Sequence, residues 1–172
     1  MYETIIDSAA GLTQANGLHG WNLDMVARSA GCAKGLVNYH FGSKDTLLAL
    51  VRERLEFQRR EARIGALAGA AGTEALDRLW RVLEEEVAAG GFGAWLDLTR
   101  HFGPSTEGAA AADDDRLAHG AARALGIAEG ELADDATVLG PALDGLQLRL
   151  LQGASPSRVR EGFERLWWGV LG

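Results

Sequence analysis

Apolar residues recur along this chain at spacings of three and four, the period of an amphipathic helix, and strand-like alternation is scarce. Four helices are predicted in the first third of the chain. The first ends at Asn16-Gly17, Asn22 caps the second, the third spans 34–40, and Ser43 caps the fourth. The apolar stripes of the first and fourth helices consist of Ile5, Ile6, Ala9, Ala10, Leu12, Leu47, Leu48, Val51 and Leu55.

The remaining two-thirds predict four or five further helices, so the fold class is all-α. Residues 103–115 are rich in Gly, Ala and Asp and contain Pro104, which predicts a loop. A short helix then ends at Gly126, and a long one ends at Gly153. Ser155 caps the last helix, with Pro156 at its first position.

Length and composition limit the class of protein. The chain has 172 residues, of which 47% are hydrophobic, enough for one compact domain or for a small module on a larger one. Its apolar runs are short and broken by charge, which predicts no membrane span, and no basic, signal-like segment opens it. The single cysteine, Cys32, cannot form an internal disulfide. We therefore expect a reduced, cytoplasmic protein.

Charge is divided unequally along the chain. The net charge of −7 argues against a general nucleic-acid coat. Residues 1–64 carry a net charge of +1, however, and residues 65–172 carry −8. The only two lysines, Lys34 and Lys44, lie in the first of these segments. Any binding of nucleic acid is therefore predicted for the N-terminal third.

The segment from Asn22 to Leu48 carries the most specific pattern. Two short predicted helices flank Gly31-Cys32-Ala33, and small apolar residues precede this turn. A helix-turn-helix has this form, because its two helices cross steeply over a turn that often contains glycine. Many other helical hairpins share the pattern, so the spacing alone does not decide between them.

The run A-G-C-A-K-G-L-V-N-Y-H-F-G-S-K-D-T-L-L, residues 30–48, resembles the signature of the TetR (tetracycline repressor) family. With the first helix included, the resemblance covers roughly residues 3–50. It implies a three-helix DNA-binding domain over 1–42, which a fourth helix joins to a regulatory and dimerisation domain over 43–172. It also implies that the last two helices pair with those of a second subunit.

The resemblance implies roles for individual residues of the third helix. Lys34 and Gly35 begin the recognition helix, and Asn38 faces the major groove, where an amide can pair with N6 and N7 of adenine. Tyr39 and His40 resemble the family's phosphate contacts.

Two neighbouring residues complete the site that the resemblance implies. Lys44, at the start of the fourth helix, resembles a phosphate anchor, where the helix dipole also favours an anion. Phe41 resembles the residue that locks the third helix onto the core.

Family members often carry a basic arm before the first helix, whereas residues 1–10 contain no Lys or Arg. A tyrosine is also common where Asn38 stands.

The aromatic residues of the middle helices have two interpretations. Their helical spacing is typical of core packing, but they could also line an apolar pocket for a small molecule. The pocket interpretation predicts an apolar or aromatic effector, neutral or cationic, because this half of the chain is acidic. It uses Trp80, Phe92, Trp95, Leu98 and Phe102.

Apolar stripes in the last two predicted helices are assigned to a homodimer interface. Gly140, Gly145, Gly162 and Gly169 lie inside these helices, where glycine costs about 1 kcal/mol relative to alanine. Close approach of helices would compensate for that cost, although a glycine-rich composition is an alternative explanation. The assigned residues are Leu143, Leu146, Leu150, Phe163 and Trp167.

Catalytic and metal chemistry are not indicated. The chain contains no Walker loop, nucleophile elbow or H-E-x-x-H motif. His101 and His119 flank three aspartates with irregular spacing, which fits a solvated acidic segment better than a metal site. Cys32 is interpreted as a small core residue. No cofactor is predicted.

The function that we expect is sequence-specific binding of a double-stranded DNA operator by a homodimer. It is expected to act as a repressor relieved by a small-molecule effector, with no role at a membrane. The alternative is a helical small-molecule-binding protein whose DNA binding is weak or lost. The missing basic arm favours this alternative. A small helical enzyme is disfavoured because no nucleophile–base pair stands out.

Overall fold

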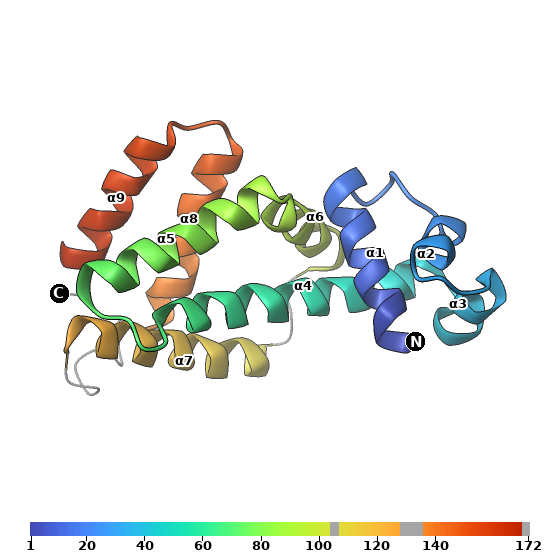
Figure 1. Ribbon diagram of the computed structural model, residues 1–172, viewed down its shortest axis with the longest axis horizontal. Helices are drawn as coiled ribbons and strands as arrows, with labels where there is room; N and C mark the ends of the chain where they lie inside the picture. The colour runs from blue at the N-terminus through green and yellow to red at the C-terminus, as the bar shows by residue number, and fades with distance from the viewer. Residues whose placement is uncertain (104–106, 128–135, 170–172) are drawn as a thin grey trace. The chain divides into compact units, whose positions relative to one another are not determined.

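The computed structural model describes residues 1–103, 107–127 and 136–169, and over these residues the protein is all-α (Figure 1). None of the described helices is both long and apolar enough to cross a membrane. The helices are α1 Tyr2–Asn16, α2 Leu23–Ser29, α3 Lys34–Phe41, α4 Lys44–Leu67, α5 Gly72–Ala88, α6 Gly91–Phe102, α7 Glu107–Leu125, α8 Ala136–Leu151 and α9 Pro156–Gly169.

The helices pack into two compact units. The first unit comprises Met1–Gln58 and Ala89–Ser105, and the second comprises Arg59–Ala88 and Thr106–Gly172. Helix α4 contains residues of both units, and α6 belongs to the first unit although its neighbours in sequence belong to the second. These units are not the ranges 1–42 and 43–172, so the boundary of a DNA-binding domain at residue 42 stays a prediction.

The residues predicted to begin and end the helices of the first unit do so in the structure. Gly17 ends α1 with a positive φ of 71°, and its N–H bonds to the carbonyl of Thr13 at 2.8 Å. Asn22 caps α2 by accepting a hydrogen bond from the Met25 N–H at 3.1 Å. Ser43 caps α4 in the same way, by accepting from the Thr46 N–H at 3.1 Å. Asn22 and Ser43 thus satisfy N–H groups at helix starts, and Gly17 satisfies a carbonyl at a helix end, all of which would otherwise be unpaired.

One apolar core holds the first unit together. It joins the stripe of α1 to α2, α3 and the first half of α4, and α6 contributes the buried Ala94 and Leu98 together with partly buried aromatic residues. Thr13 is buried in α1, and its hydroxyl accepts a hydrogen bond from the Trp21 indole N–H at 3.0 Å. The least exposed apolar residues of this core are Ile5, Ala9, Val26, Val37, Leu47, Val51 and Leu98.

Gly90 allows α6 to approach α1 closely. It stands just before α6 with a φ of 79°, a conformation that glycine adopts at little cost. A Cβ at this position would lie 2.6 Å from the backbone oxygen of Gln14. Residue 90 is therefore limited to glycine by conformation and by space.

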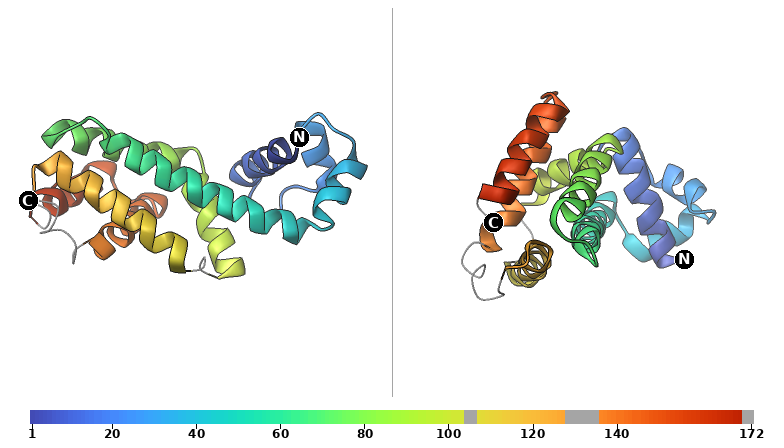
Figure 2. Two further views of the ribbon diagram at one scale, coloured as in Figure 1. Left: turned by 90° about the horizontal axis from the view of Figure 1, so that it is seen from below. Right: turned by 60° about the vertical axis from the view of Figure 1, so that its left-hand side comes forward.

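The second unit is a bundle of α5, α7, α8, α9 and the last part of α4 (Figure 2). Its core contains the predicted stripes of α5, α8 and α9, and Trp80 stacks on Phe163 with ring centroids 5.8 Å apart. Helix α7 begins at Glu107, so the prediction of a loop over 103–115 is wrong from residue 107 onward. Four consecutive alanines, residues 109–112, favour helix strongly enough to outweigh the glycine and aspartates around them.

A polar network is buried in the second unit. Arg59 and Arg63, one turn apart on α4, are only 8% and 5% exposed. Both donate to the Asp144 carboxylate of α8, at 2.8 and 2.6 Å, and Arg59 also donates to Glu86 of α5. Gln147 accepts from both guanidinium groups. Burial, and then the charge of Arg59, lower the pKa of Arg63.

Candidate nucleic-acid interface

Helices α2 and α3 form a compact helix-turn-helix in the first unit. Gly31 has a φ of 66°, and the Cys32 N–H returns to the Ala27 carbonyl at 2.9 Å, which closes the end of α2. Val37 and Phe41, four residues apart on α3, are buried in the core. Phe41 is 4% exposed, as expected for a residue that locks this helix in place.

The structure brings the predicted DNA-contacting residues of α3 to its solvent-facing side. Lys34, Gly35, Asn38, Tyr39 and His40 are all exposed. Tyr39 is 83% exposed, which is unusually high for a large aromatic side chain. A helix held by one buried face and lined with polar and aromatic groups on the other has the form of a recognition helix.

Lys34 is held by an acidic neighbour. Its ammonium group lies 3.0 and 3.1 Å from the two carboxylate oxygens of Asp24 on α2. Both side chains are about half exposed, so the ion pair is weak and is screened by salt. The pair reduces the positive charge that the start of α3 offers to an anion.

Lys44 is oriented by Trp21. Its ammonium group donates to the Trp21 carbonyl at 2.7 Å and lies 4.2 Å from the centroid of the indole ring. Burial lowers the pKa of Lys44, and the nearby Asp45 only partly offsets the effect. One of its three donors is used internally, so two remain for a phosphate. Trp21 was not predicted from the sequence, although its position next to the capping Asn22 could have suggested it.

Tyr2 joins the aromatic residues at the end of α3. Its ring stacks on Phe41, with centroids 4.9 Å apart, and meets His40 edge-on at 5.7 Å. His40 in turn meets Tyr39 edge-on at 5.4 Å. Tyr2 was not predicted from the sequence, because helical periodicity does not indicate that the start of α1 packs against the end of α3.

The acidic residues near the N-terminus are paired. Arg54 on α4 donates to Asp7 at 2.9 Å and also forms an ion pair with Glu3. The two carboxylates that stand where a basic arm is common thus share one cation from the same unit, which offsets part of their charge. Their repulsion of a nearby phosphate is correspondingly reduced.

The predicted pocket residues do not come together in one unit. Trp80 is 3% exposed and lies in the core of the second unit, whereas Trp95, Leu98 and Phe102 pack into the core of the first. Phe92 is 1% exposed and contacts Trp95, also in the first unit. These side chains therefore pack in the cores of the two units, as the core interpretation predicts. Their contact with a ligand stays a prediction.

The residues assigned to a dimer interface lie wholly or partly in the core of the second unit, and their contact with a second subunit stays a prediction. Leu143, Phe163 and Trp167 are fully buried inside their own subunit, and Leu146 and Leu150 pack partly against the same core. The apolar period of a helix identifies its buried face but not whether a partner subunit covers it. The exposed apolar residues of α8 and α9 are Val138, Leu151 and Trp168.

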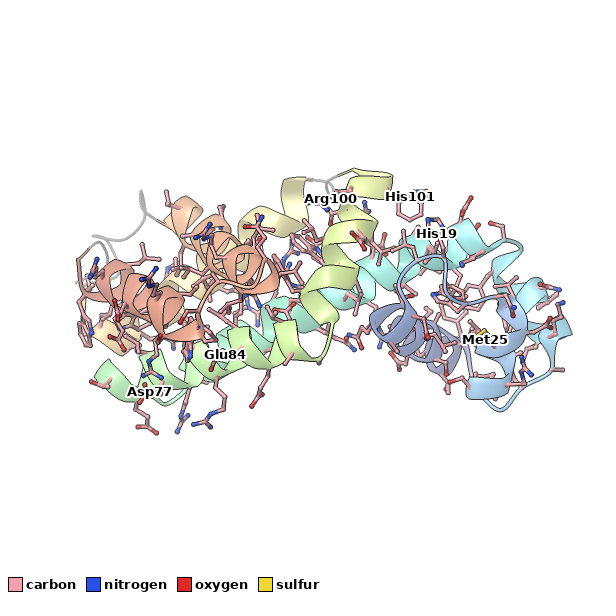
Figure 3. All side chains as sticks on the ribbon, turned by 90° about the horizontal axis from the view of Figure 1, so that it is seen from above. His19, Met25, Asp77, Glu84, Arg100 and His101 are labelled. Carbon is pink, nitrogen blue, oxygen red and sulfur yellow. The ribbon has the colours of Figure 1, made fainter. Side chains whose placement is uncertain are left out.

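Two open pockets were not predicted from the sequence. In the first unit, His19, Asp97, Arg100 and His101 line a hollow of about 550 Å³ between the α1–α2 turn and the end of α6. His19, Arg100 and His101 are labelled in Figure 3. In the second unit, a hollow of about 370 Å³ lies between α8 and α9. Among the described residues, no group of three or more His, Cys, Asp or Glu is placed to hold a metal ion.

Comparison with known families and structures identifies what the chain is similar to. The sequence profile described as "Bacterial regulatory proteins, tetR family" matches residues 5–51. This segment contains the helix-turn-helix and the start of α4. A search of curated proteins found no match.

Solved structures share the fold over nearly the whole chain. A TetR-family transcriptional regulator from Streptomyces coelicolor is 18% identical with a TM-score of 0.66, covering 99% of this chain and 93% of its own. A TetR-like transcriptional regulator from Rhodococcus sp. RHA1 is 20% identical with a TM-score of 0.63, covering 99% and 94%. The multidrug binding protein EbrR, complexed with imidazole, is 24% identical with a TM-score of 0.62, covering 96% and 88%. At these identities the likeness shows the fold alone.

Proposed function

We propose that this chain is a DNA-binding regulator of the tetR type, and that it acts as a repressor that a small molecule releases from its operator. The match of residues 5–51 to the profile of the tetR family of bacterial regulatory proteins supports this proposal. The single observation that carries DNA contact is the exposed face of α3. That face presents Lys34, Asn38 and Tyr39 on a helix that Val37 and Phe41 anchor in the core. Asn38 can read an adenine in the major groove, while Tyr39, His40 and Lys44 hold the backbone.

Two copies are needed for useful affinity. One recognition helix of eight residues reads only a few base pairs, and helix-turn-helix proteins gain specificity by pairing half-sites about 34–36 Å apart. The outward faces of α8 and α9 can supply the contact between copies. Trp168 is 49% exposed there, and Gly145 and Gly162 leave open space at their positions.

Relief by an effector requires a ligand that binds one state of the protein better than the other. The second unit buries the charged groups of Arg59 and Arg63, which costs desolvation energy, and buried charged groups with shifted pKa values often mark functional sites. The EbrR structures, with imidazole and with ethidium, give a precedent for small-molecule binding in this fold, although for a different protein. An apolar or aromatic effector remains our proposal for this chain.

Titration of duplex DNA from upstream of the chain's own gene, at several salt concentrations, tests the function. We expect binding that is tighter than to mixed-sequence DNA and that weakens steeply with salt. Asn38→Ala should cost about 1–3 kcal/mol on the true site and little on mixed sequence. Absence of binding to any duplex would favour the second candidate, a small-molecule-binding protein, which the lack of Lys or Arg in residues 1–10 supports.

The effector proposal has a separate test. Thermal melting of the purified protein in the presence of apolar, aromatic and cationic compounds reports any ligand that prefers the folded state. At one hundred times its dissociation constant, such a ligand stabilises the fold by about 2.7 kcal/mol. A compound that raises the melting temperature should also weaken DNA binding. If only polyanions raise it, the proposed class of effector is wrong.

A further inference from the structure

Tyr2 lies at the edge of the surface that α3 presents. Its ring is fixed by stacking on the buried Phe41 and by its edge-on contact with His40. The residue is 40% exposed, and none of the described residues hydrogen-bonds to its hydroxyl. A phenol whose ring is held by the core and whose hydroxyl has no partner among the described residues is a preorganised hydrogen-bond donor.

We propose that Tyr2 is a further DNA-contacting residue, whose hydroxyl donates to a backbone phosphate beside the one that His40 contacts. This inference rests on the proposed function, because it requires α3 to enter the major groove. Residues that flank a recognition helix then face the sugar–phosphate backbone at the wall of the groove rather than the base edges. Tyr2, packed against the last turn of α3, occupies such a flanking position.

The charges around Tyr2 favour a neutral contact here. Residues 1–10 contain no Lys or Arg, and their two carboxylates, Glu3 and Asp7, are both paired with Arg54. The pairing limits repulsion of an incoming phosphate without supplying a free cation. Tyrosine can then do by hydrogen bonding part of what a basic arm does by charge, and phosphate oxygens accept readily from tyrosine.

A neutral donor leaves a signature that a cation does not. Lysine and arginine contacts release counterions, so they set the slope of log K against log salt, whereas a tyrosine hydroxyl releases none. Tyr2→Phe keeps the stacked ring and removes only the hydroxyl. We expect it to weaken binding of mixed-sequence duplex DNA about tenfold per half-site at every salt concentration, with the slope unchanged. A hydrogen bond to a charged group of about 1.4 kcal/mol corresponds to that factor.

The matched control is Thr4→Val. Thr4 is an exposed hydroxyl in the same helical turn, but at 3.6 residues per turn it points about 200° away from Tyr2. The Thr4→Val substitution should leave DNA binding unchanged. A third variant, Tyr2→Ala, also removes the ring and should bind more weakly than Tyr2→Phe, because His40 loses its support. Melting temperatures of all variants, measured in parallel, show whether each one is folded.

The outcomes separate this inference from the function on which it rests. Unchanged affinity of Tyr2→Phe, in a protein that otherwise binds DNA, overturns the phosphate contact and leaves the function intact. An equal loss in Thr4→Val also overturns it, because the effect would then belong to the end of α1 in general. A change in the salt slope would indicate that charge and not the hydroxyl is involved. If the wild-type chain binds no duplex, both proposals fail.

Discussion

Lys44 shows at the scale of single residues what sequence patterns can and cannot give. Its place at the start of α4 was predicted, since Ser43 is a recognisable cap. Its contact with Trp21, which lies 23 positions earlier in the chain, was not predicted, because helical periodicity carries no information about tertiary neighbours. The same limit hid the contact of Tyr2 with Phe41 and the pairing of Arg54 with Glu3 and Asp7.

Replacing Lys44 tests whether it anchors a phosphate. Lys44→Ala should weaken DNA binding about equally on all sequences and reduce the salt slope by about one per half-site, because one fewer counterion is released. Titrations at several salt concentrations measure both quantities. Arg81→Ala, which removes an exposed cation from α5, should leave the slope unchanged. If Lys44→Ala keeps the wild-type slope, then Lys44 serves only to bind Trp21.

Asp24 is expected to oppose DNA binding. Asp24→Asn removes the carboxylate that pairs with Lys34 and leaves that ammonium group free for a phosphate. Affinity for mixed-sequence DNA should rise about threefold to tenfold at low salt, since a nearby like charge is lost and a cation is gained. Stability should change by less than about 0.5 kcal/mol, because the ion pair is exposed. Weaker binding would mean instead that Asp24 positions Lys34 productively.

Helices were predicted best where glycine or a capping side chain marks their ends. Gly17, Gly126 and Gly153 stand just beyond α1, α7 and α8 and have positive φ, as their positions in the sequence indicated. The start of α7 was misplaced, since Pro104 and the aspartates suggested a loop more strongly than four alanines suggested a helix. The packing of α6 in the first unit was also missed, because its stripe does not specify which core it joins.

The buried network joining α4, α5 and α8 predicts a stability effect at the scale of elements. Asp144→Ala leaves Arg59 and Arg63 buried with one fewer acceptor, so the free energy of unfolding should fall by about 3 kcal/mol. This is the low end of the expected range, since the Asp144 side chain is 32% exposed. Urea denaturation measures the effect.

Asp97→Ala provides the control for this network. Asp97 forms only an exposed ion pair with Arg100, at 3.8 Å, and its loss should cost less than about 0.5 kcal/mol. Equal effects of the two substitutions would show that the network does not hold the second unit together. A drop in DNA affinity in Asp144→Ala beyond that of the control would indicate that the position of α4 also affects the recognition helix.

For the whole molecule, hydrophobic patterning predicted an all-α fold but not the partition of its apolar surface. The stripes of α8 and α9 were assigned to a contact with a second subunit. Several of their residues lie in the core of their own subunit, and the contact with a second subunit stays a prediction. A sequence pattern indicates that a residue is buried, but not whether its own subunit or a second subunit covers it. An exposed apolar side chain in the folded chain is the better guide to a subunit interface.

Trp168 therefore provides the test of the dimer. It is 49% exposed on α9, so a charge there should not disturb the core of the subunit but should be strongly unfavourable inside a contact between copies. We expect the wild-type protein to be a dimer at micromolar concentration by size-exclusion chromatography with light scattering, and Trp168→Glu to be a folded monomer with weakened operator binding. Phe57→Glu, at another exposed apolar residue, 60% exposed on α4, should stay dimeric. A monomeric wild type would remove the pairing of half-sites from the mechanism, and a dimeric Trp168→Glu would move the interface to another surface.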